Sequence, residues 1–220
     1  MRIEKKDMLL YAVTDRTWLG GRSLAKQVEE CIKAGATFIQ LREKNLPFTG
    51  FVKAAKEIKA VTDRYGVPFV INDDVEVALE ADADGVHIGQ GDEDIITVRE
   101  KLGSHKIIGL SAHNVEEAKK AQAMGADYIG VGAVFGTATK TDATPVPFDT
   151  LRSICKAVRI PVVAIGGISK ENIHKLAGSG IDGVAVISAI FAQPDIGRAT
   201  SELLRLSRQV VTDNGEQGPV

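Results

Sequence analysis

Acidic and amide side chains follow two neighbouring apolar runs of the sequence. Asn72 and Asp73 end the run PFVIND, and Asp92 follows the next run in GVHIGQGD. Carboxylate and amide oxygens suit a hard cation. With so few protein ligands, the pattern predicts Mg²⁺ that is bound partly through substrate phosphates and water. The alternative is helix capping, in which Asp73 or Asp74 caps a helix that begins at Val75 and Asp92 caps the following helix.

Basic side chains occupy comparable positions after two other apolar runs. Arg42 and Lys44 end the run TFIQLREK, and Lys140 lies in FGTATK. Together with the two aspartates, these cations predict a diphosphate ligand, because its charge needs both a metal ion and basic side chains. The alternative for the first cluster is an ion pair between Arg42 and Glu43, but neighbouring residues on a strand point to opposite faces.

A second anion site is predicted after the last two apolar runs. Gly166 and Gly167 end the run VVAIGG, and Ser188 ends GVAVIS. Glycine lets the backbone approach an anion without a Cβ atom in the way, and loops at these positions of a barrel commonly bind a monophosphate. A Gly-Gly pair is also ordinary turn chemistry, so the prediction depends on its place after a strand.

Hydroxyl groups form a third polar set. Ser111, Thr137 and Thr139 can orient a heterocycle or bind a carboxylate, although Thr139 can equally bond to the loop backbone. The four histidines show no paired-ligand spacing for zinc, and the sequence contains no nucleophile elbow, Walker loop or dinucleotide fingerprint. One metal-assisted diphosphate site and one metal-free monophosphate site together predict a transferase that joins two phosphorylated molecules and releases diphosphate.

Eight short apolar runs must position these groups, and a stretch with helical patterning follows each of them. The runs are LLYAVTD, TFIQLREK, PFVIND, DGVHIGQGD, IIGLSAH, YIGVGAVFGTATK, VVAIGG and DGVAVIS. Among the helical stretches, SLAKQVEECIKAG has an N-cap candidate in Ser23 and stops at Gly35, and Asn114 with Glu117 resembles a capping box. Strands that alternate with helices predict a parallel sheet whose carboxyl ends share one edge.

A weak internal repeat favours a closed barrel over an open doubly wound sheet. The segments GATFIQL, DADGVHI, GADYIGV and GIDGVAV begin at Gly35, Asp82, Gly125 and Gly180, and each ends a helix and enters an even-numbered strand. A fourfold βαβα repeat closes naturally into eight strands. The sequence therefore predicts one α/β domain over residues 1–220, a (β/α)8 TIM barrel with its core at about 8–207 and a polar tail at 210–220.

Composition excludes several classes of function. The 27 basic and 29 acidic residues give a net charge of −2, so no global field favours nucleic acid or an anionic membrane. Cys31 and Cys155 are expected to be packed thiols in a reducing compartment. The first apolar run is too short for a signal peptide, and no run reaches membrane-spanning length. We therefore expect a cytoplasmic globular protein.

Seven motifs in order closely resemble the thiamine phosphate synthase family, over about Leu9 to Phe191. They are QLREK (40–44), IND (71–73), GVHIGQGD (85–92), GLSAH (109–113), GAVFGTATKTDA (132–143), AIGGI (164–168) and GVAVIS (183–188). The resemblance implies a TIM barrel that condenses a pyrimidine methyl diphosphate with a thiazole ethyl phosphate, or its carboxylated form. It implies a dissociative reaction in which diphosphate leaves before the thiazole nitrogen attacks, and it is compatible with a homodimer.

The resemblance also implies roles for individual residues. The pyrimidine diphosphate would be held by Gln40, Leu41, Arg42, Glu43, Lys44, Asn72, Ser111 and Lys140, of which Arg42, Lys44, Ser111 and Lys140 would be catalytic. Asp73 and Asp92 would bind Mg²⁺. The thiazole and its phosphate would be held by Thr137, Ala138, Thr139, Gly167, Ile187 and Ser188.

The chain departs from the family pattern at two places, and two other functions are alternatives. Gly136 stands where a proline is common, and Asp74 stands where other polar residues are usual. A thiazole tautomerase of the same superfamily would keep the thiazole phosphate site but would need no diphosphate machinery. A protein that binds thiamine precursors without catalysis is the alternative from a different functional class.

Overall fold

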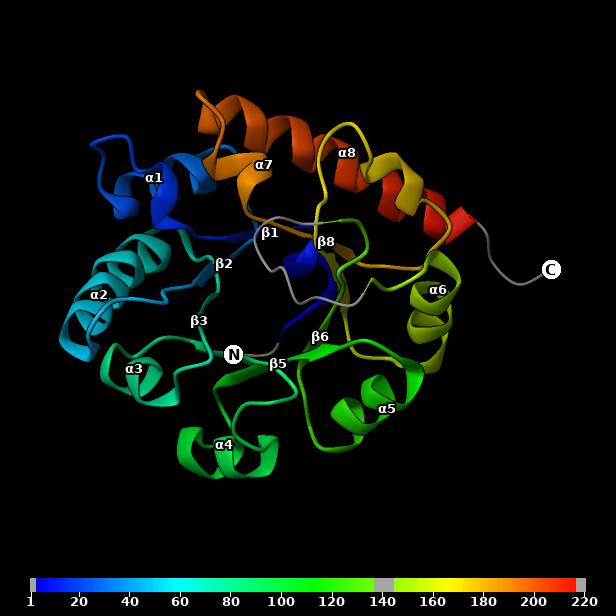
Figure 1. Cartoon of the computed structure of the whole chain (residues 1–220), viewed down its shortest axis with the longest axis horizontal. Coiled ribbons are helices and arrows are strands. Elements are labelled where there is room, and N and C mark those ends of the chain that lie inside the picture. Colours follow the sequence, from blue (N-terminus) through cyan, green and yellow to red (C-terminus); the bar gives the residue numbers. More distant parts are fainter. Residues whose placement is uncertain (1–2, 137–144, 217–220) are drawn as a thin grey trace.

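The computed structural model of the chain describes residues 3–136 and 145–216, and it shows a closed barrel of eight parallel strands (Figure 1). The strands are β1 (Leu10–Val13), β2 (Phe38–Leu41), β3 (Phe69–Asn72), β4 (Gly85–Ile88), β5 (Ile107–Ala112), β6 (Tyr128–Val131), β7 (Val162–Ile165) and β8 (Gly183–Val186). Each strand pairs with its neighbour in sequence, and β8 pairs with β1 to close the ring. The predicted TIM barrel is confirmed, and the open sheet is excluded.

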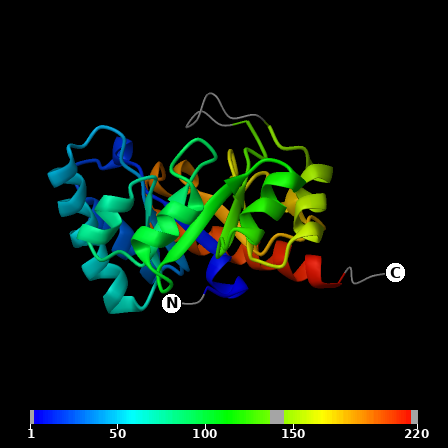
Figure 2. The ribbon, with the colours of Figure 1, turned by 90° about the horizontal axis from the view of Figure 1, so that it is seen from below.

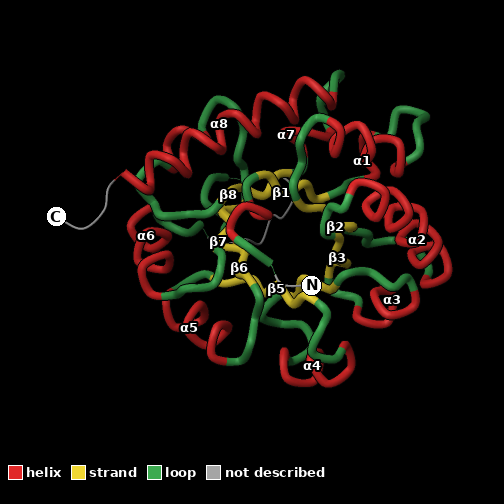
Figure 3. The backbone as a smooth tube through the Cα atoms, turned by 180° about the vertical axis from the view of Figure 1, so that it is seen from behind, coloured by secondary structure: helices red, strands yellow, loops and turns green. Residues whose placement is uncertain are grey.

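Helices surround the strands on the outside of the ring (Figure 3). The α-helices are α1 (Leu24–Lys33), α2 (Phe48–Tyr65), α3 (Val75–Glu80), α4 (Ile95–Leu102), α5 (Val115–Ala123), α6 (Phe148–Ala157), α7 (Ser188–Phe191) and α8 (Ile196–Glu216). Short 3₁₀ helices are η1 (Lys5–Met8), η2 (Arg16–Trp18) and η3 (Ile173–Leu176). A helical stretch was expected after the seventh strand, and between β7 and β8 the structure has the short 3₁₀ helix η3. The long α8 contacts both η3 and β8 and covers this part of the barrel.

Two of the predicted helix starts are confirmed, one of them with a changed detail. Ser23 caps α1 by accepting a hydrogen bond from the N–H of Lys26. Asn114 caps α5 by accepting one from the N–H of Glu117. The Glu117 carboxylate, however, accepts from the N–H of His113 rather than from that of Asn114, so the predicted reciprocal capping box does not form.

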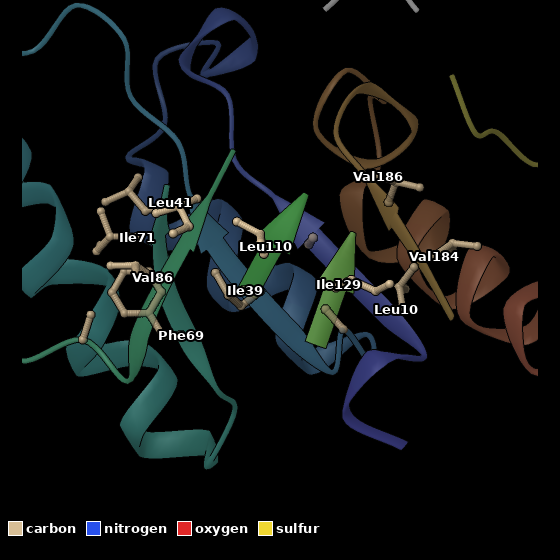
Figure 4. Packing of buried hydrophobic residues seen from close by; sticks show 14 of the residues in the cluster. Leu10, Ile39, Leu41, Phe69, Ile71, Val86, Leu110, Ile129, Val184 and Val186 are labelled. Carbon is tan, nitrogen blue, oxygen red and sulfur yellow. The ribbon is translucent and has the colours of Figure 1, made fainter. Parts of the chain in front are cut away.

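Alternate residues of the strands belong to two separate apolar layers. One set, with Leu10, Ile39 and Val86 among its members, packs against the surrounding helices, and ten of its side chains are labelled in Figure 4. The other set fills the inside of the ring and contains Tyr11 and Tyr128. This two-sided burial explains why the strands read as continuous apolar runs rather than as alternating ones.

The N-terminal segment closes the end of the barrel from which the strands start. Met8 of η1 is fully buried, and both Ile3 and Met8 belong to the inner apolar layer. The helix contacts β1, β7 and β8, and it lies near the centre of the ring in Figure 3. We therefore look for a site at the opposite end of the barrel, where the strands finish and the predicted polar loops begin.

The internal repeat has a common structural basis at the start of each even-numbered strand. In the four repeats the side chains of Thr37, Asp84, Asp127 and Asp182 accept a hydrogen bond from an N–H at the start of the preceding strand. The first residue of each of the four repeats also has a left-handed backbone, with φ of 108° at Gly35, 50° at Asp82, 89° at Gly125 and 88° at Gly180. Each repeat thus locks a pair of strands in register through one side chain.

Removing one of these locks is expected to destabilise the barrel. Asp182 is 7% exposed and accepts a hydrogen bond of 2.9 Å from the buried N–H of Val162. Asp182→Ala leaves that donor unpaired and should lower the free energy of unfolding by about 1–3 kcal/mol, measured by urea denaturation. Its ion-pair partner Lys5 has a side chain that is 67% exposed, so Lys5→Ala should cost less than about 0.5 kcal/mol. Equal costs for the two variants would contradict this role.

The two cysteines are free thiols, as predicted. Cys31 is buried and Cys155 is partly buried, and burial raises the pKa of each thiol to about 12. Such thiols are unreactive at neutral pH because the thiolate is the reactive form. Within the described part of the chain, no helix combines the length and the apolar character needed to cross a membrane.

Candidate active site

The predicted site residues that the structure describes lie at the ends of the strands or in the loops that follow them. In the side view of Figure 2 the green strand arrows point to the upper edge of the molecule, and η1 lies at the lower edge. Gln40 on β2 is buried inside the ring, Ser111 on β5 is half-buried, and Asp73 and Asp92 are exposed in the loops. The polar groups therefore extend from the inside of the barrel to its open edge.

The structure separates the aspartates that cap helices from those that do not. Asp74, not Asp73, caps α3 by accepting a hydrogen bond from the N–H of Val77. Asp94, not Asp92, caps α4 by accepting one from the N–H of Ile96. Helix capping therefore does not account for Asp73 or Asp92.

Both remaining aspartates occupy turns that follow adjacent strands. Asp73 adopts a left-handed backbone with φ 64°, which is uncommon outside glycine, and its N–H donates to the carbonyl of His87 at 2.9 Å. Asp92 folds back on its own loop, where Oδ2 accepts a hydrogen bond of 2.6 Å from the N–H of Gly89. Strands β3 and β4 pair directly, with Asn72 beside His87, so the two loops start side by side.

The donor set at these two loops fits a hard cation with few protein ligands. Among residues 3–136 and 145–216, no group of three or more His, Cys, Asp or Glu side chains is placed to hold a metal ion. Two carboxylates from adjacent loops would leave most of the coordination sphere to water and ligand phosphates. This is the usual arrangement for Mg²⁺ in phosphate-handling sites, and it does not suit zinc.

Two residues of the segment QLREK have side chains that contact the rest of the protein: Glu43 forms an ion pair and Leu41 is buried. The carboxylate of Glu43 forms an ion pair with Arg16 of η2, so the alternative pair with Arg42 is not formed. Burial raises the pKa of the Glu43 carboxyl above its usual value, although Arg16 acts in the opposite direction. Leu41 is fully buried in the outer apolar layer, which leaves only its backbone for contact with a ligand.

The two cations of this segment differ in how they are held. Arg42 is half-buried, and its backbone N–H donates to the side-chain hydroxyl of Thr14 at 3.2 Å. Thr14 is itself fully buried and follows β1, so it ties the end of β2 to the end of β1. Lys44 is exposed in the loop that leads to α2. Arg42 is therefore the more rigidly placed of the two.

The glycine pair after β7 forms a tight turn. Gly166 and Gly167 have φ values of 102° and 64°, and a Cβ atom on Gly167 would lie 2.3 Å from the carbonyl oxygen of Gly136. Asn172 fixes this turn because its side-chain amide donates to the carbonyl of Gly167 at 2.8 Å. The spacing of the motif did not indicate Asn172, whose amide acts from the loop that leads into η3.

The other predicted members of this region divide into two groups. Ile187 packs against the inner apolar layer, and Ser188 begins the four-residue helix α7 at an exposed position. Thr137, Ala138, Thr139 and Lys140 lie outside the described residues. Their roles stay predictions from the sequence.

A hydrogen-bond chain inside the barrel links two predicted site residues that lie on different strands. Gln40 Nε2 donates to the hydroxyl of Tyr11 at 2.6 Å, and that oxygen lies 2.8 Å from the hydroxyl of Tyr128. The Tyr128 hydroxyl lies 3.0 Å from Nδ1 of His87, whose Nε2 lies 3.1 Å from the hydroxyl of Ser111. We did not identify Tyr11 or Tyr128 from the sequence, although strand alternation places both on the inner face.

Two glycines make room for this chain. A Cβ atom on Gly109 would lie 2.1 Å from the ring of Tyr128, and one on Gly130 would lie 3.1 Å from the ring of His87. Burial raises the pKa of both tyrosines well above the usual value, so their hydroxyls stay protonated. The glycines inside GLSAH and YIGVG thus have a packing function that their motifs alone did not reveal.

Comparisons with known proteins show which sequences and structures the chain is similar to. Residues 10–190 match the family model described as thiamine monophosphate synthase. The chain is 49% identical to a thiamine-phosphate synthase of Clostridium tetani, covering 92% of this chain and 97% of the relative, and 51% identical to one of Alkaliphilus oremlandii, covering 90% and 94%. A solved structure of a thiamine phosphate pyrophosphorylase from Pyrococcus furiosus superposes with a TM-score of 0.86 at 40% identity, covering 94% of this chain and 98% of that one.

Proposed function

This chain is a transferase of the thiamine monophosphate synthase family, and we propose that it makes thiamine phosphate from two phosphorylated precursors. The first is 4-amino-2-methyl-5-pyrimidinylmethyl diphosphate, and the second is a thiazole ethyl phosphate or its carboxylated form. The observation that supports this most is the placement of Arg42, Asp73 and Asp92 after adjacent strands, where neither aspartate caps a helix and Glu43 pairs with Arg16 rather than with Arg42.

The proposed reaction exchanges one bond for another. The bond between the methylene carbon and the diphosphate oxygen breaks first, and its electron pair leaves with diphosphate. The thiazole nitrogen then donates its lone pair to the methylene cation and forms the new carbon–nitrogen bond. The thiazole nitrogen is the nucleophile, so the site needs no nucleophilic side chain, and no oxidant or reductant is involved. With the carboxylated thiazole, the carboxylate also leaves as CO₂ and the product takes up a proton from solvent in its place.

The basic side chains stabilise the charge that develops on the leaving group. Arg42, Lys44 and Lys140 are proposed to hold the diphosphate, and preorganised positive charge there lowers the barrier to carbon–oxygen cleavage. Asp73 and Asp92 would hold Mg²⁺, which supplies further positive charge to the phosphate oxygens when it is bound. Gln40, Asn72 and Ser111 would orient the pyrimidine, and backbone atoms of Leu41 and Glu43 would line its binding site.

The second substrate is assigned to the loops after β6, β7 and β8. Gly167, Ile187 and Ser188 would bind the monophosphate, and Thr137, Ala138 and Thr139 would contact the thiazole. The left-handed turn at Gly167 supports this assignment, because it brings backbone close to the site without a side chain. We place the reaction in a reducing compartment such as the cytoplasm, since both cysteines are free thiols.

The assay that tests the function mixes the purified protein with both substrates, with and without Mg²⁺, and measures diphosphate release. We expect release only when both substrates and the metal are present. Release without metal would contradict the roles of Asp73 and Asp92. Binding of both substrates without turnover would favour a protein that only binds thiamine precursors, and turnover of a thiazole phosphate alone would favour a tautomerase.

The glycine turn gives a test that is specific to the monophosphate half of the site. Gly167→Ala should weaken binding of the thiazole phosphate on the order of tenfold, because the new methyl group meets the carbonyl of Gly136 and shifts the turn. Calorimetric titration of the thiazole phosphate measures this effect, and the pyrimidine diphosphate should bind as before.

The matched control for this variant is Gly66→Ala at the end of α2. Gly66 has nearly the same backbone, with φ 66°, but a Cβ atom there meets nothing within 4 Å. Both variants carry the cost of a left-handed alanine, about 1–2 kcal/mol of stability. Only Gly167→Ala should change thiazole phosphate binding, and an equal change in the two variants would mean that the effect is general destabilisation.

A further inference from the structure

The hydrogen-bond chain inside the barrel links Gln40 to Ser111, two residues of the predicted pyrimidine site. We propose that Tyr11, Tyr128 and His87 are positioning residues that fix the direction of the hydrogen bonds at Gln40 and Ser111, and that this direction makes the site select a 4-aminopyrimidine over a 4-oxopyrimidine. This inference rests on the proposed function, because it concerns how the same site recognises its pyrimidine.

The donor and acceptor in each hydrogen bond of this hydrogen-bond chain follow from Gln40, its first residue. The amide nitrogen of Gln40 can only donate, so the hydroxyl oxygen of Tyr11 accepts from it. The single proton of Tyr11 is then directed to the hydroxyl of Tyr128, and the proton of Tyr128 is directed to Nδ1 of His87. Each hydroxyl lies between two partners, one that gives it a hydrogen bond and one that receives its proton.

The tautomer of His87 follows from the same reasoning. Because Nδ1 accepts from Tyr128, a neutral imidazole carries its proton on Nε2. That nitrogen lies 3.1 Å from the hydroxyl of Ser111 and donates to it. The hydroxyl proton of Ser111 is therefore directed away from His87 and toward whatever binds at the ends of the strands.

The two ends of the chain thus present different hydrogen-bonding groups to a ligand. At one end the Gln40 amide oxygen, which the bond to Tyr11 does not use, is an acceptor. At the other end the Ser111 hydroxyl is a donor. An aminopyrimidine offers the complementary pair, since its exocyclic amino group donates and its ring nitrogen accepts.

A 4-oxopyrimidine reverses this pattern. Its exocyclic oxygen accepts, and the neighbouring ring nitrogen carries a hydrogen and donates. To bind it equally well, the Gln40 amide would have to rotate, both tyrosine protons would have to reverse, and the tautomer of His87 would have to change. The chain couples all these changes, so one mismatched contact leaves a buried polar group unpaired.

Packing keeps this chain rigid. Tyr11 and Tyr128 are 1% and 0% exposed, so water cannot readily replace a missing partner. The ring of Phe38 lies 4.5 Å from that of Tyr11 and 5.4 Å from that of Tyr128, between centroids, and it holds both rings without taking part in the hydrogen bonds. Phe38 is therefore the natural control position for this chain.

The decisive variant is Tyr128→Phe, which removes one hydroxyl from the middle of the chain. The measurement is the ratio of kcat/KM for the 4-amino pyrimidine methyl diphosphate to kcat/KM for its 4-oxo analogue. We expect this ratio to fall on the order of tenfold relative to the wild-type protein, as for the loss of one directed hydrogen bond. Tyr11→Phe, which cuts the chain next to Gln40, should lower the same ratio.

Phe38→Leu serves as the packing control. It loosens both tyrosine rings but keeps every hydrogen-bonding group, so it should lower both kcat/KM values together and leave their ratio unchanged. A folded Tyr128→Phe protein with the wild-type ratio would overturn the proposal. A Phe38→Leu ratio that falls as much as that of Tyr128→Phe would overturn it as well, because packing alone would then explain the selectivity.

The tautomer of His87 gives a readout that needs no substrate. In the ligand-free wild-type protein, ¹⁵N NMR of labelled histidine should show the Nε2-protonated form, and Tyr128→Phe should mix the two tautomers. An Nδ1-protonated His87 in the wild-type protein would overturn the assigned direction.

Calorimetric binding of the two pyrimidine diphosphates separates this proposal from the reaction itself. Tight selective binding by a protein that releases no diphosphate would refute the proposed function and leave the inference standing. Condensation with equal use of both pyrimidines would refute the inference alone.

Discussion

Asp92→Asn is expected to lower kcat on the order of a hundredfold while leaving the affinity for the thiazole phosphate nearly unchanged. The substitution keeps an oxygen that can accept from the N–H of Gly89, so the loop should hold its shape. It removes one of the two negative charges that would hold Mg²⁺, and lost charge stabilisation of a transition state costs about this much. Steady-state kinetics at saturating metal measures the first effect, and calorimetry measures the second.

The control for this variant is the neighbouring Asp94, which caps α4. Asp94→Ala should lower the free energy of unfolding by about 1 kcal/mol, because the N–H of Ile96 loses its partner, and turnover should stay near the wild-type value. If Asp92→Asn impairs turnover and thiazole phosphate binding equally, Asp92 supports the structure and does not hold the metal ion.

Lys140→Ala is expected to lower kcat on the order of a hundredfold or more. The motif FGTATK places this cation among the groups proposed to hold the leaving diphosphate, where positive charge counts most in the transition state. Single-turnover measurement of diphosphate release should show the loss directly, and Lys140→Arg should restore part of the rate.

Lys101 provides the matched control for the loss of a lysine. Its ammonium group pairs with Glu93 at the surface, 2.7 Å from the carboxylate, and the side chain is 39% exposed. Lys101→Ala should change turnover little, because an exposed ion pair of this kind contributes at most about 1 kcal/mol to stability. Normal turnover of Lys140→Ala would remove Lys140 from the mechanism.

The architecture was predictable because its signals are local and repeated. Every strand falls inside a predicted apolar run, and the four repeats mark the places where one side chain locks two strands. The short 3₁₀ helix η3 was not predicted from the sequence. No longer helix is required there because α8, which lies near the end of the sequence, contacts η3 and β8 and covers the same surface. No local pattern around Ile173 contains that information.

For the candidate site, the sequence predicts which loops contribute, but it does not distinguish the roles of similar side chains within those loops. Three aspartates, Asp73, Asp74 and Asp92, look alike in sequence, and only backbone geometry shows that Asp74 is the helix cap. The partner of Glu43 is Arg16, which lies on the loop after a different strand. Contacts of this kind join distant segments, so spacing along the chain cannot reveal them.

The inner hydrogen-bond chain was missed for a different reason. Tyr11 and Tyr128 look like ordinary core aromatics in their strands, and their hydroxyls become informative only when the barrel brings β1 and β6 within reach of each other. The space for Tyr128 comes from Gly109, a residue that reads as a simple interruption of an apolar run. A glycine on the inner face of a barrel strand is thus a sign that a large side chain crosses from elsewhere.

The N-terminal segment that closes the barrel has a practical consequence for handling the protein. Ile3 and Met8 are buried in the same inner apolar layer as Tyr11, Phe38 and Tyr128, so a truncation that removes them would expose this layer to solvent. Tags are better attached after α8, which runs along the outside of the ring.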